Sequence, residues 1–132
     1  MSAENVALVR SVYDNFANGD IPAVLGVLSP EIEWVETDSA DLPHRGTHIG
    51  PQAVAEKVFG MVMANFDEFA VVPETLLDAG ADVVVQGRAV GITKSGRKLD
   101  APAAWVWTVE DGKAVRNVNY HDTQAWVSAL NG

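Results

Sequence analysis

Residues 96–122 read GRKLDAPAAWVWTVEDGKAVRNVNYHD, a long β-rich stretch with an Asp-Gly pair between its two halves. An Asp-Gly pair between alternating runs is the strongest short-range signal of a β-hairpin, because a type I′ turn needs positive φ at both central residues. We therefore predict a long hairpin that turns at Asp111-Gly112 and ends at Asp122. The segments upstream are expected to pack against it.

The rest of the chain divides into segments that are bounded by capping and turn residues. Residues 38–50 are rich in Asp, Gly, Pro and His and show no periodicity, so we expect a loop over one end of the fold. The other predicted elements are a helix from N-cap Ser2 to Asn18-Gly19, a shorter helix from Asp20 to Ser29-Pro30, a strand over residues 31–37, a helix opening at Gly50-Pro51 with Val54, Val58, Met61 and Val62 facing inward, strands over 66–78 and 83–92, and a last helix over 123–130.

The order of these elements predicts an α+β fold. Strands that follow one another through hairpins form an antiparallel sheet, and helices grouped at the start cover one of its faces. Pro73 predicts an edge strand or a bulge, while Gly87 and Gly91 allow the sheet to curve. A curved antiparallel sheet wrapped around the N-terminal helices makes a cone of the cystatin-like kind, with a pocket at its open end.

Composition excludes several classes of function. The 132 residues carry a net charge of −9, which disfavours binding to nucleic acid and to anionic lipid surfaces. No apolar run is long enough to span a membrane, and the N-terminus has no signal-peptide pattern. The absence of cysteine removes disulfides and thiolate chemistry, so we expect a cytoplasmic protein.

Four motifs, taken in order, resemble one known superfamily. They are the helix Val6–Phe16 with its Asn18-Gly19-Asp20 break, the run Leu28–Trp34, the loop from Arg45-Gly46 to Gly50-Pro51, and the run from Trp107 through Asp111-Gly112 to Thr123. This order is similar to that of ketosteroid isomerase, scytalone dehydratase and, most of all, the SnoaL-like polyketide cyclases. The resemblance covers residues 1–132 as a single SnoaL-like domain and implies the cone-shaped α+β fold.

The resemblance singles out two carboxylates as candidate catalytic residues. SnoaL-like cyclases carry an acid/base aspartate near the end of the last strand, close to Asp122. The alternative for Asp122 is the N-cap of the last helix. Glu36 falls near the position of the general base of ketosteroid isomerase, an aspartate. Beside Trp34 and Ile32 this carboxylate would be poorly solvated and a good proton acceptor; the alternative is a strand-end Glu that reaches solvent.

Other candidates lie on the hairpin and in the loop. Trp105 stands where many SnoaL-like sequences have a histidine, and it lines either the pocket or an interface on the outer face of the sheet. Asn119 and His121 share a face with Asn117, which is either solvated or the polar wall of the pocket. His44 and His48 invite a metal interpretation, but in a loop their spacing fixes nothing, and we favour His44 closing over a ligand.

These candidates give two hypotheses of different classes. The first is a small cofactor-free and metal-free enzyme that acts on an apolar, carbonyl-bearing or polycyclic ligand by isomerisation, cyclisation or dehydration. Glu36 or Asp122 would be the base, and His121, Asn119 or His44 would stabilise an oxyanion or position the substrate. Tyr13, Trp34, Phe59 and Trp105 would supply apolar walls. The second is a non-catalytic binding or dimerisation module. In either case we expect a homodimer formed through the sheet.

Overall fold

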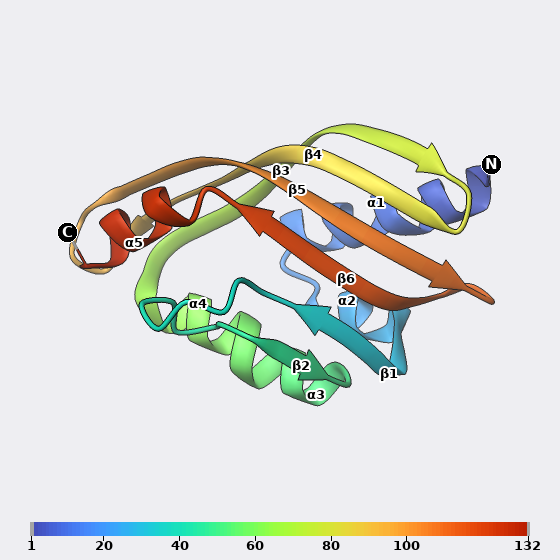
Figure 1. Ribbon diagram of the computed structural model, residues 1–132, viewed down its shortest axis with the longest axis horizontal. Helices are drawn as coiled ribbons and strands as arrows, with labels where there is room; N and C mark the ends of the chain where they lie inside the picture. The colour runs from blue at the N-terminus through green and yellow to red at the C-terminus, as the bar shows by residue number, and fades with distance from the viewer. Residues whose placement is uncertain (1, 132) are drawn as a thin grey trace.

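The computed structural model describes residues 2–131 and shows a curved sheet with helices packed into its hollow side (Figure 1). Its elements are α1 (Ala3–Ala17), α2 (Ile21–Val27), β1 (Leu28–Val35), β2 (Thr47–Ile49), α3 (Pro51–Val54), the π-helix η1 (Ala55–Phe59), α4 (Gly60–Asn65), β3 (Phe66–Ala79), β4 (Asp82–Thr93), β5 (Lys98–Glu110), β6 (Lys113–His121) and α5 (Thr123–Asn131). The α+β fold predicted from the sequence is confirmed. None of the helices in the described part of the chain has the length and apolar character needed to cross a membrane.

The sheet has six strands in the order β2-β1-β6-β5-β4-β3. All neighbouring strands are antiparallel except β1 and β6, which run parallel with Trp34 opposite Asn117 and Val35 opposite Val118. The prediction of a wholly antiparallel sheet is therefore wrong for this one pair. A parallel pair needs a long crossover, and here the crossover comprises everything between residues 36 and 112. Strand β2, inside the segment predicted as loop, is also new.

The predicted hairpin is confirmed. Asp111 and Gly112 have φ values of 51° and 74°, as a type I′ turn requires, and Glu110 pairs with Lys113 across the turn. The register places Trp105 opposite Asn119 and Trp107 opposite Asn117. Because both members of a cross-strand pair point to the same face, these four side chains all project into the hollow of the sheet.

Strand β3 forms one edge of the sheet, as Pro73 predicted. The register with β4 shifts between Pro73 and Thr75, so this proline marks a bulge as well as an edge. Gly87 and Gly91 of β4 lie directly against the β3 backbone: a Cβ on Gly87 would stand 2.1 Å from the Val72 carbonyl oxygen. The two glycines thus allow the close approach that bends the sheet.

The helix that opens at Pro51 contains a π-turn that the sequence pattern did not indicate. The Gly60 N–H donates to the Ala55 carbonyl, five residues back. The wider turn brings Val54, Val58 and Val62 into one buried line. It also rotates Met61 outward, where 38% of its surface is exposed, so the prediction that Met61 faces inward is wrong.

The core lies between α1 and the hollow face of the sheet. Val9, Val12 and Tyr13 of α1 pack on Val83 and Val85 of β4 and on the tryptophans of β1 and β5. A second cluster lies at the other end, where α5 packs on β5. It contains Leu42 from the loop after β1, together with Phe66, Leu99, Ala101, Trp126 and Ala129. Between the two clusters the side chains leave a cavity.

The contact at Gly87 predicts a large effect of one methyl group. Gly87→Ala should lower the free energy of unfolding by about 1–3 kcal/mol, because the new Cβ overlaps the Val72 carbonyl and the strands must separate. Gly26→Ala is the control: nothing lies within 4 Å of its Cβ position in α2, and alanine favours helix by about 0.5–1 kcal/mol. Urea unfolding measures both, and equal stabilities would contradict this account of the bend.

Candidate functional site

The cavity has a volume of about 360 Å³ and is lined mostly by aromatic and aliphatic side chains. Its polar groups gather at one end: Glu36, His44, Asn119 and His121. The lining residues that are exposed mark its mouth: Ala17, Gly19, Met63 and Ala70. The aromatic residues of the wall are Tyr13, Phe16, Trp34, Phe59, Phe69, Trp105, Trp107 and Trp126.

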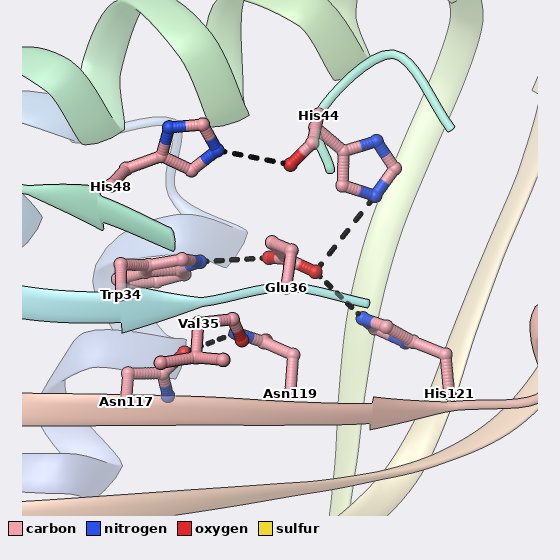
Figure 2. A network of polar contacts seen from close by, with 8 residues as sticks. All are labelled: Trp34, Val35, Glu36, His44, His48, Asn117, Asn119 and His121. Carbon is pink, nitrogen blue, oxygen red and sulfur yellow. Dashed lines mark hydrogen bonds and ion pairs between the residues drawn. The ribbon is translucent and has the colours of Figure 1, made fainter. Parts of the chain in front are cut away.

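Glu36 lies at the centre of the polar end (Figure 2). It directly follows β1, and its N–H donates to the Gly46 carbonyl at 2.9 Å, which continues the strand geometry by one residue. Alternation along β1 turns the side chain inward, so that only 6% of Glu36 is exposed. The alternative interpretation of the sequence, in which Glu36 reaches solvent at the end of the strand, therefore does not describe this residue.

The two carboxylate oxygens of Glu36 have different partners. Oε2 accepts a hydrogen bond from the Trp34 indole N–H at 2.7 Å. Oε1 lies 3.2 Å from Nε2 of His121 and 3.9 Å from Nε2 of His44. Hydrogen bonds to a charged oxygen are about twice as strong as those between neutral groups, so the indole fixes the carboxylate plane with Oε1 directed toward the two imidazoles.

His44 is held deep in the wall by its own loop. Only 2% of the residue is exposed, its carbonyl oxygen lies 3.2 Å from Nε2 of His48, and its ring packs on Trp126 with 5.0 Å between centroids. Burial lowers the pKa of His44 below its ordinary range; Glu36 opposes this effect, while His121 and His48 add to it. His44 is therefore neutral at pH 7. Within residues 2–131, no group of three His, Cys, Asp or Glu side chains is placed to hold a metal ion.

Asn117 and Asn119 lie on the hollow face of β6, so the polar row is a wall of the interior and not a solvated face. The Asn119 amide nitrogen donates to the Val35 carbonyl at 3.0 Å and to Oδ1 of Asn117. These two bonds use both of its N–H groups. No N–H of Asn119 remains for an oxyanion, so the role in positioning a substrate, through Oδ1, is the one that stays a prediction.

Tyr13 supplies a hydroxyl to the wall of the cavity. Its oxygen accepts a hydrogen bond from the Trp107 indole N–H at 2.9 Å, and its own proton has no acceptor within residues 2–131. Burial raises the pKa of Tyr13 far above its ordinary range, and the Trp107 hydrogen bond only partly opposes this effect. Tyr13 therefore stays protonated and is free to donate to a ligand.

Trp105 lies inside, on the Tyr13 ring with 5.6 Å between centroids, and not on the outer face of the sheet. The predicted wall residues Trp34 and Phe59 also meet at the cavity, edge to face with 5.5 Å between centroids. The structure thus brings together Tyr13, Trp34, Glu36, His44, Phe59, Trp105, Asn119 and His121.

Asp122 is the exception among the predicted site residues. It is exposed, does not line the cavity, and accepts a hydrogen bond from the Ala125 N–H at 3.1 Å through Oδ1. This is the N-cap geometry that the alternative interpretation described. Its neighbour His121 points inward because strand alternation turns consecutive residues to opposite faces.

Trp126 is a site residue that the sequence did not indicate. It comes from α5, and its ring packs on both His44 and His121, with centroid distances of 5.0 and 5.2 Å. The segment was predicted to be a helix, and Trp126 with Ala129 and Leu130 already marked an apolar side. The sequence did not indicate where on the sheet this apolar side of the helix packs.

The buried, neutral His44 predicts that stability falls in mild acid. Its folded pKa is lowered, so below the unfolded value of about 6.5 the unfolded chain binds a proton that the folded chain does not. The contribution of His44 to unfolding free energy should therefore fall by up to about 1.4 kcal/mol per pH unit below that pH.

The measurement is urea unfolding between pH 8 and pH 5 for the natural chain and for His44→Gln. The variant should lose less stability between pH 6.5 and pH 5, while the two curves run parallel above pH 7. A variant whose acid slope equals that of the natural chain would contradict the assignment of this loss to His44.

Solved structures of known proteins share this fold along their whole length. An NTF2-like protein of unknown function from Burkholderia pseudomallei has a TM-score of 0.91 and 26% identity, with all of both chains covered. TerC, co-crystallised with polyporic acid, has a TM-score of 0.90 and 25% identity over 98% of this chain and 100% of its own. A protein from a Jannaschia species assigned as a SnoaL-like polyketide cyclase has a TM-score of 0.81 and 21% identity over 100% and 96%.

No curated protein matches the chain in sequence. The model of the SnoaL-like domain family matches residues 9–117, which include Tyr13, Trp34, Glu36 and His44 of the site. Asn119, His121 and Trp126 follow that match in the chain and complete the polar end. The match covers more than half of the residues, and the chain belongs to the SnoaL-like domain family.

Proposed function

We propose that the chain is a small enzyme that moves a proton on an apolar, carbonyl-bearing or polycyclic molecule, in an isomerisation, cyclisation or dehydration that needs no cofactor. One observation carries the proposal: a carboxylate that is 6% exposed lies at the end of an aromatic cavity of about 360 Å³. Buried carboxylates that face a ligand-sized cavity are typical of general bases.

In the proposed step, Glu36 takes a proton from a carbon next to the ligand's carbonyl group. The electron pair of the broken C–H bond forms the enolate double bond, and the carbonyl oxygen becomes an oxyanion. Oε1 accepts the proton, because Trp34 occupies Oε2. Tyr13, whose proton is free, donates to the oxyanion. Where the ligand has a double bond next to the deprotonated carbon, the enolate is a dienolate, and return of the proton from Glu36 to the far carbon of that double bond completes an isomerisation.

His121 is the proposed partner of Glu36 in this transfer. Its Nε2 lies 3.2 Å from Oε1, within hydrogen-bond reach, and its side chain is 6% exposed. An imidazole in this place donates to the carboxylate before the transfer and keeps Oε1 directed toward the cavity. Asp122, which caps α5, has no part in the proposal.

The similarity to TerC supports a flat ligand. TerC was co-crystallised with polyporic acid and matches this chain at 25% identity with a TM-score of 0.90. In the present cavity Trp34 of β1 and Trp105 and Trp107 of β5 offer ring faces and edges. An engineered cavity of about 150 Å³ holds one benzene ring, so the volume of the cavity suits a ligand of two or three rings.

Exchange of the C2 protons of 1-tetralone in D₂O tests the base directly. The natural chain should accelerate this exchange, followed by ¹H NMR, and Glu36→Gln should reduce the acceleration about 100-fold or more, because the amide cannot accept the proton. Asp122→Asn is the matched control, since asparagine caps a helix as well as aspartate and should leave the rate unchanged. Equal acceleration by the Glu36→Gln protein would overturn the assignment of the base.

A second candidate function is that of a binding module without catalysis. It is favoured by Trp105, which stands where many SnoaL-like sequences have a histidine and which cannot transfer a proton at neutral pH. Binding of 1-tetralone to the natural chain without any accelerated exchange would support this candidate over the enzyme.

We propose in addition that two copies of the chain associate through the outer face of the sheet. Cross-strand pairing places Val35, Val118, Val106 and Val84 in one row across four strands on that face. Tyr120 beside the row is 58% exposed. The helices α1 to α4 lie toward the opposite, hollow face (Figure 1). An apolar row that crosses the middle of a sheet is suited to packing against its own copy.

Sedimentation velocity tests the proposed dimer. The natural chain should have a molecular mass of twice 14.1 kDa in solution. Val106→Asp should reduce the mass to 14.1 kDa, because it places a charge in the middle of the row. Gln124→Asp, on the exposed side of α5, makes the same change in charge and should remain a dimer. A monomeric natural chain at micromolar concentration would contradict the proposal.

A further inference from the structure

We infer that the polar end of the cavity selects ligands that bear a hydrogen-bond donor, a hydroxyl or an N–H on the ring, and that Asn119 is the residue that recognises it. The inference rests on the proposed binding cavity and adds a substrate class to it: ring compounds that carry a hydroxyl or amino group, which bind in preference to the same rings without one. It concerns binding and is independent of whether Glu36 acts as a base.

The orientation of the Asn119 amide follows from its neighbours. Its nitrogen faces two acceptors, the Val35 carbonyl oxygen at 3.0 Å and Oδ1 of Asn117. If the amide were turned over, its oxygen would face those two acceptors in a site where the residue is only 6% exposed. Turning the Asn117 amide as well would restore one of these pairs, but the Val35 backbone carbonyl cannot turn. A buried pair of oxygens would remain without a proton, so the nitrogen of Asn119 points this way.

This orientation leaves Oδ1 of Asn119 as the atom available to a ligand. Asn119 lines the cavity, and its Oδ1 accepts no hydrogen bond within residues 2–131. Oδ1 is also not among the fully enclosed atoms that lack a partner, so it keeps contact with the cavity. An amide oxygen accepts hydrogen bonds and donates none.

The other polar atoms at this end add acceptors and not donors. Both oxygens of Glu36 accept, and the facing His121 Nε2 already points at Oε1. Trp34 has its only N–H on Glu36, and His44 is directed toward the same carboxylate at 3.9 Å. The free proton of Tyr13 is the donor on the aromatic wall. A ligand therefore meets acceptors at Asn119 and Glu36 and a donor at Tyr13.

A ligand that places a methyl ether or a second carbonyl at the polar end leaves these acceptors without a proton. Such a ligand displaces water from these acceptors without replacing the lost hydrogen bonds. Sites built to hydrogen-bond a hydroxyl reject analogues that lack it far more strongly than apolar pockets reject a change of size, because the buried polar group stays unpaired. The expected preference for the hydroxyl is tenfold or more.

Equilibrium dialysis at pH 7 with 2-naphthol and 2-methoxynaphthalene measures this preference, since the two probes share a ring system and differ in the hydroxyl proton. The natural chain should bind 2-naphthol at least tenfold more tightly. Asn119→Ala should reduce the ratio of the two Kd values to about threefold or less. Asn5→Ala also removes a side-chain amide, one that donates to the Gly80 carbonyl and does not line the cavity, and it should keep the full ratio.

Each outcome has a distinct meaning. Equal binding of both probes by the natural chain would overturn the inference while leaving the proton-exchange result for Glu36 untouched. An undiminished ratio in Asn119→Ala would remove Asn119 as the residue responsible. Asn119→Ser, which keeps a short hydroxyl near the Val35 carbonyl, serves if the alanine variant does not fold. Binding of neither probe would contradict the inference and the proposed cavity together.

Discussion

A carboxylate that is shut off from water has to find hydrogen-bond donors within the protein, and the arrangement of the sheet meets this constraint for Glu36. One donor is Trp34, two residues earlier on the same face of the strand. The other comes from β6, because the parallel pairing of β1 with β6 carries His121 to the end of β1. A slip of one residue in this register would turn His121 to the outer face and away from Glu36. The parallel pairing of β1 with β6 thus provides one of the two donors that the buried carboxylate needs.

The hydrogen bonds of the neighbouring polar groups likewise determine which of their atoms stay free. Trp107 donates to Tyr13 and so frees the phenol proton, while Asn117 and the Val35 carbonyl occupy the amide protons of Asn119 and so free its oxygen. Other nitrogens are left without a partner within residues 2–131: Nδ1 of His44, Nδ1 of His121, Nδ2 of Asn117 and Nε1 of Trp126. Buried unpaired groups cost stability, and their concentration around Glu36 is typical of a site shaped for function at the expense of stability.

Local signals in the sequence predicted the elements well, whereas long-range pairing decided the site. The Asp111-Gly112 turn and the Pro73 edge each depend on a few adjacent residues, and both are found as predicted. Asp122 takes the N-cap position that was the alternative to a catalytic role. The burial of Glu36 was left open, because it depends on which strand lies beside β1. The paired residues of β6 are 83 positions further along the chain, and local alternation does not predict such a pairing. The π-turn before Gly60 rotated Met61 outward, and Trp126 entered the site through the packing of a whole helix.

The family model matches residues 9–117, and the residues of the cavity that follow this match differ in kind from those within it. The matched part contains the aromatic walls and Glu36, which determine the size of the ligand and the presence of a carboxylate. The groups that give the polar end its hydrogen-bonding character, Asn119 and His121, and the Trp126 ring that packs on both histidines come from the last fifteen residues. The apolar walls supply affinity in proportion to the surface they bury and discriminate weakly, whereas the few polar contacts orient the ligand and reject those that leave them unpaired. A shared cone can therefore hold ligands of similar shape in many relatives, while the polar groups near the end of this chain set the hydrogen bonds that a ligand meets.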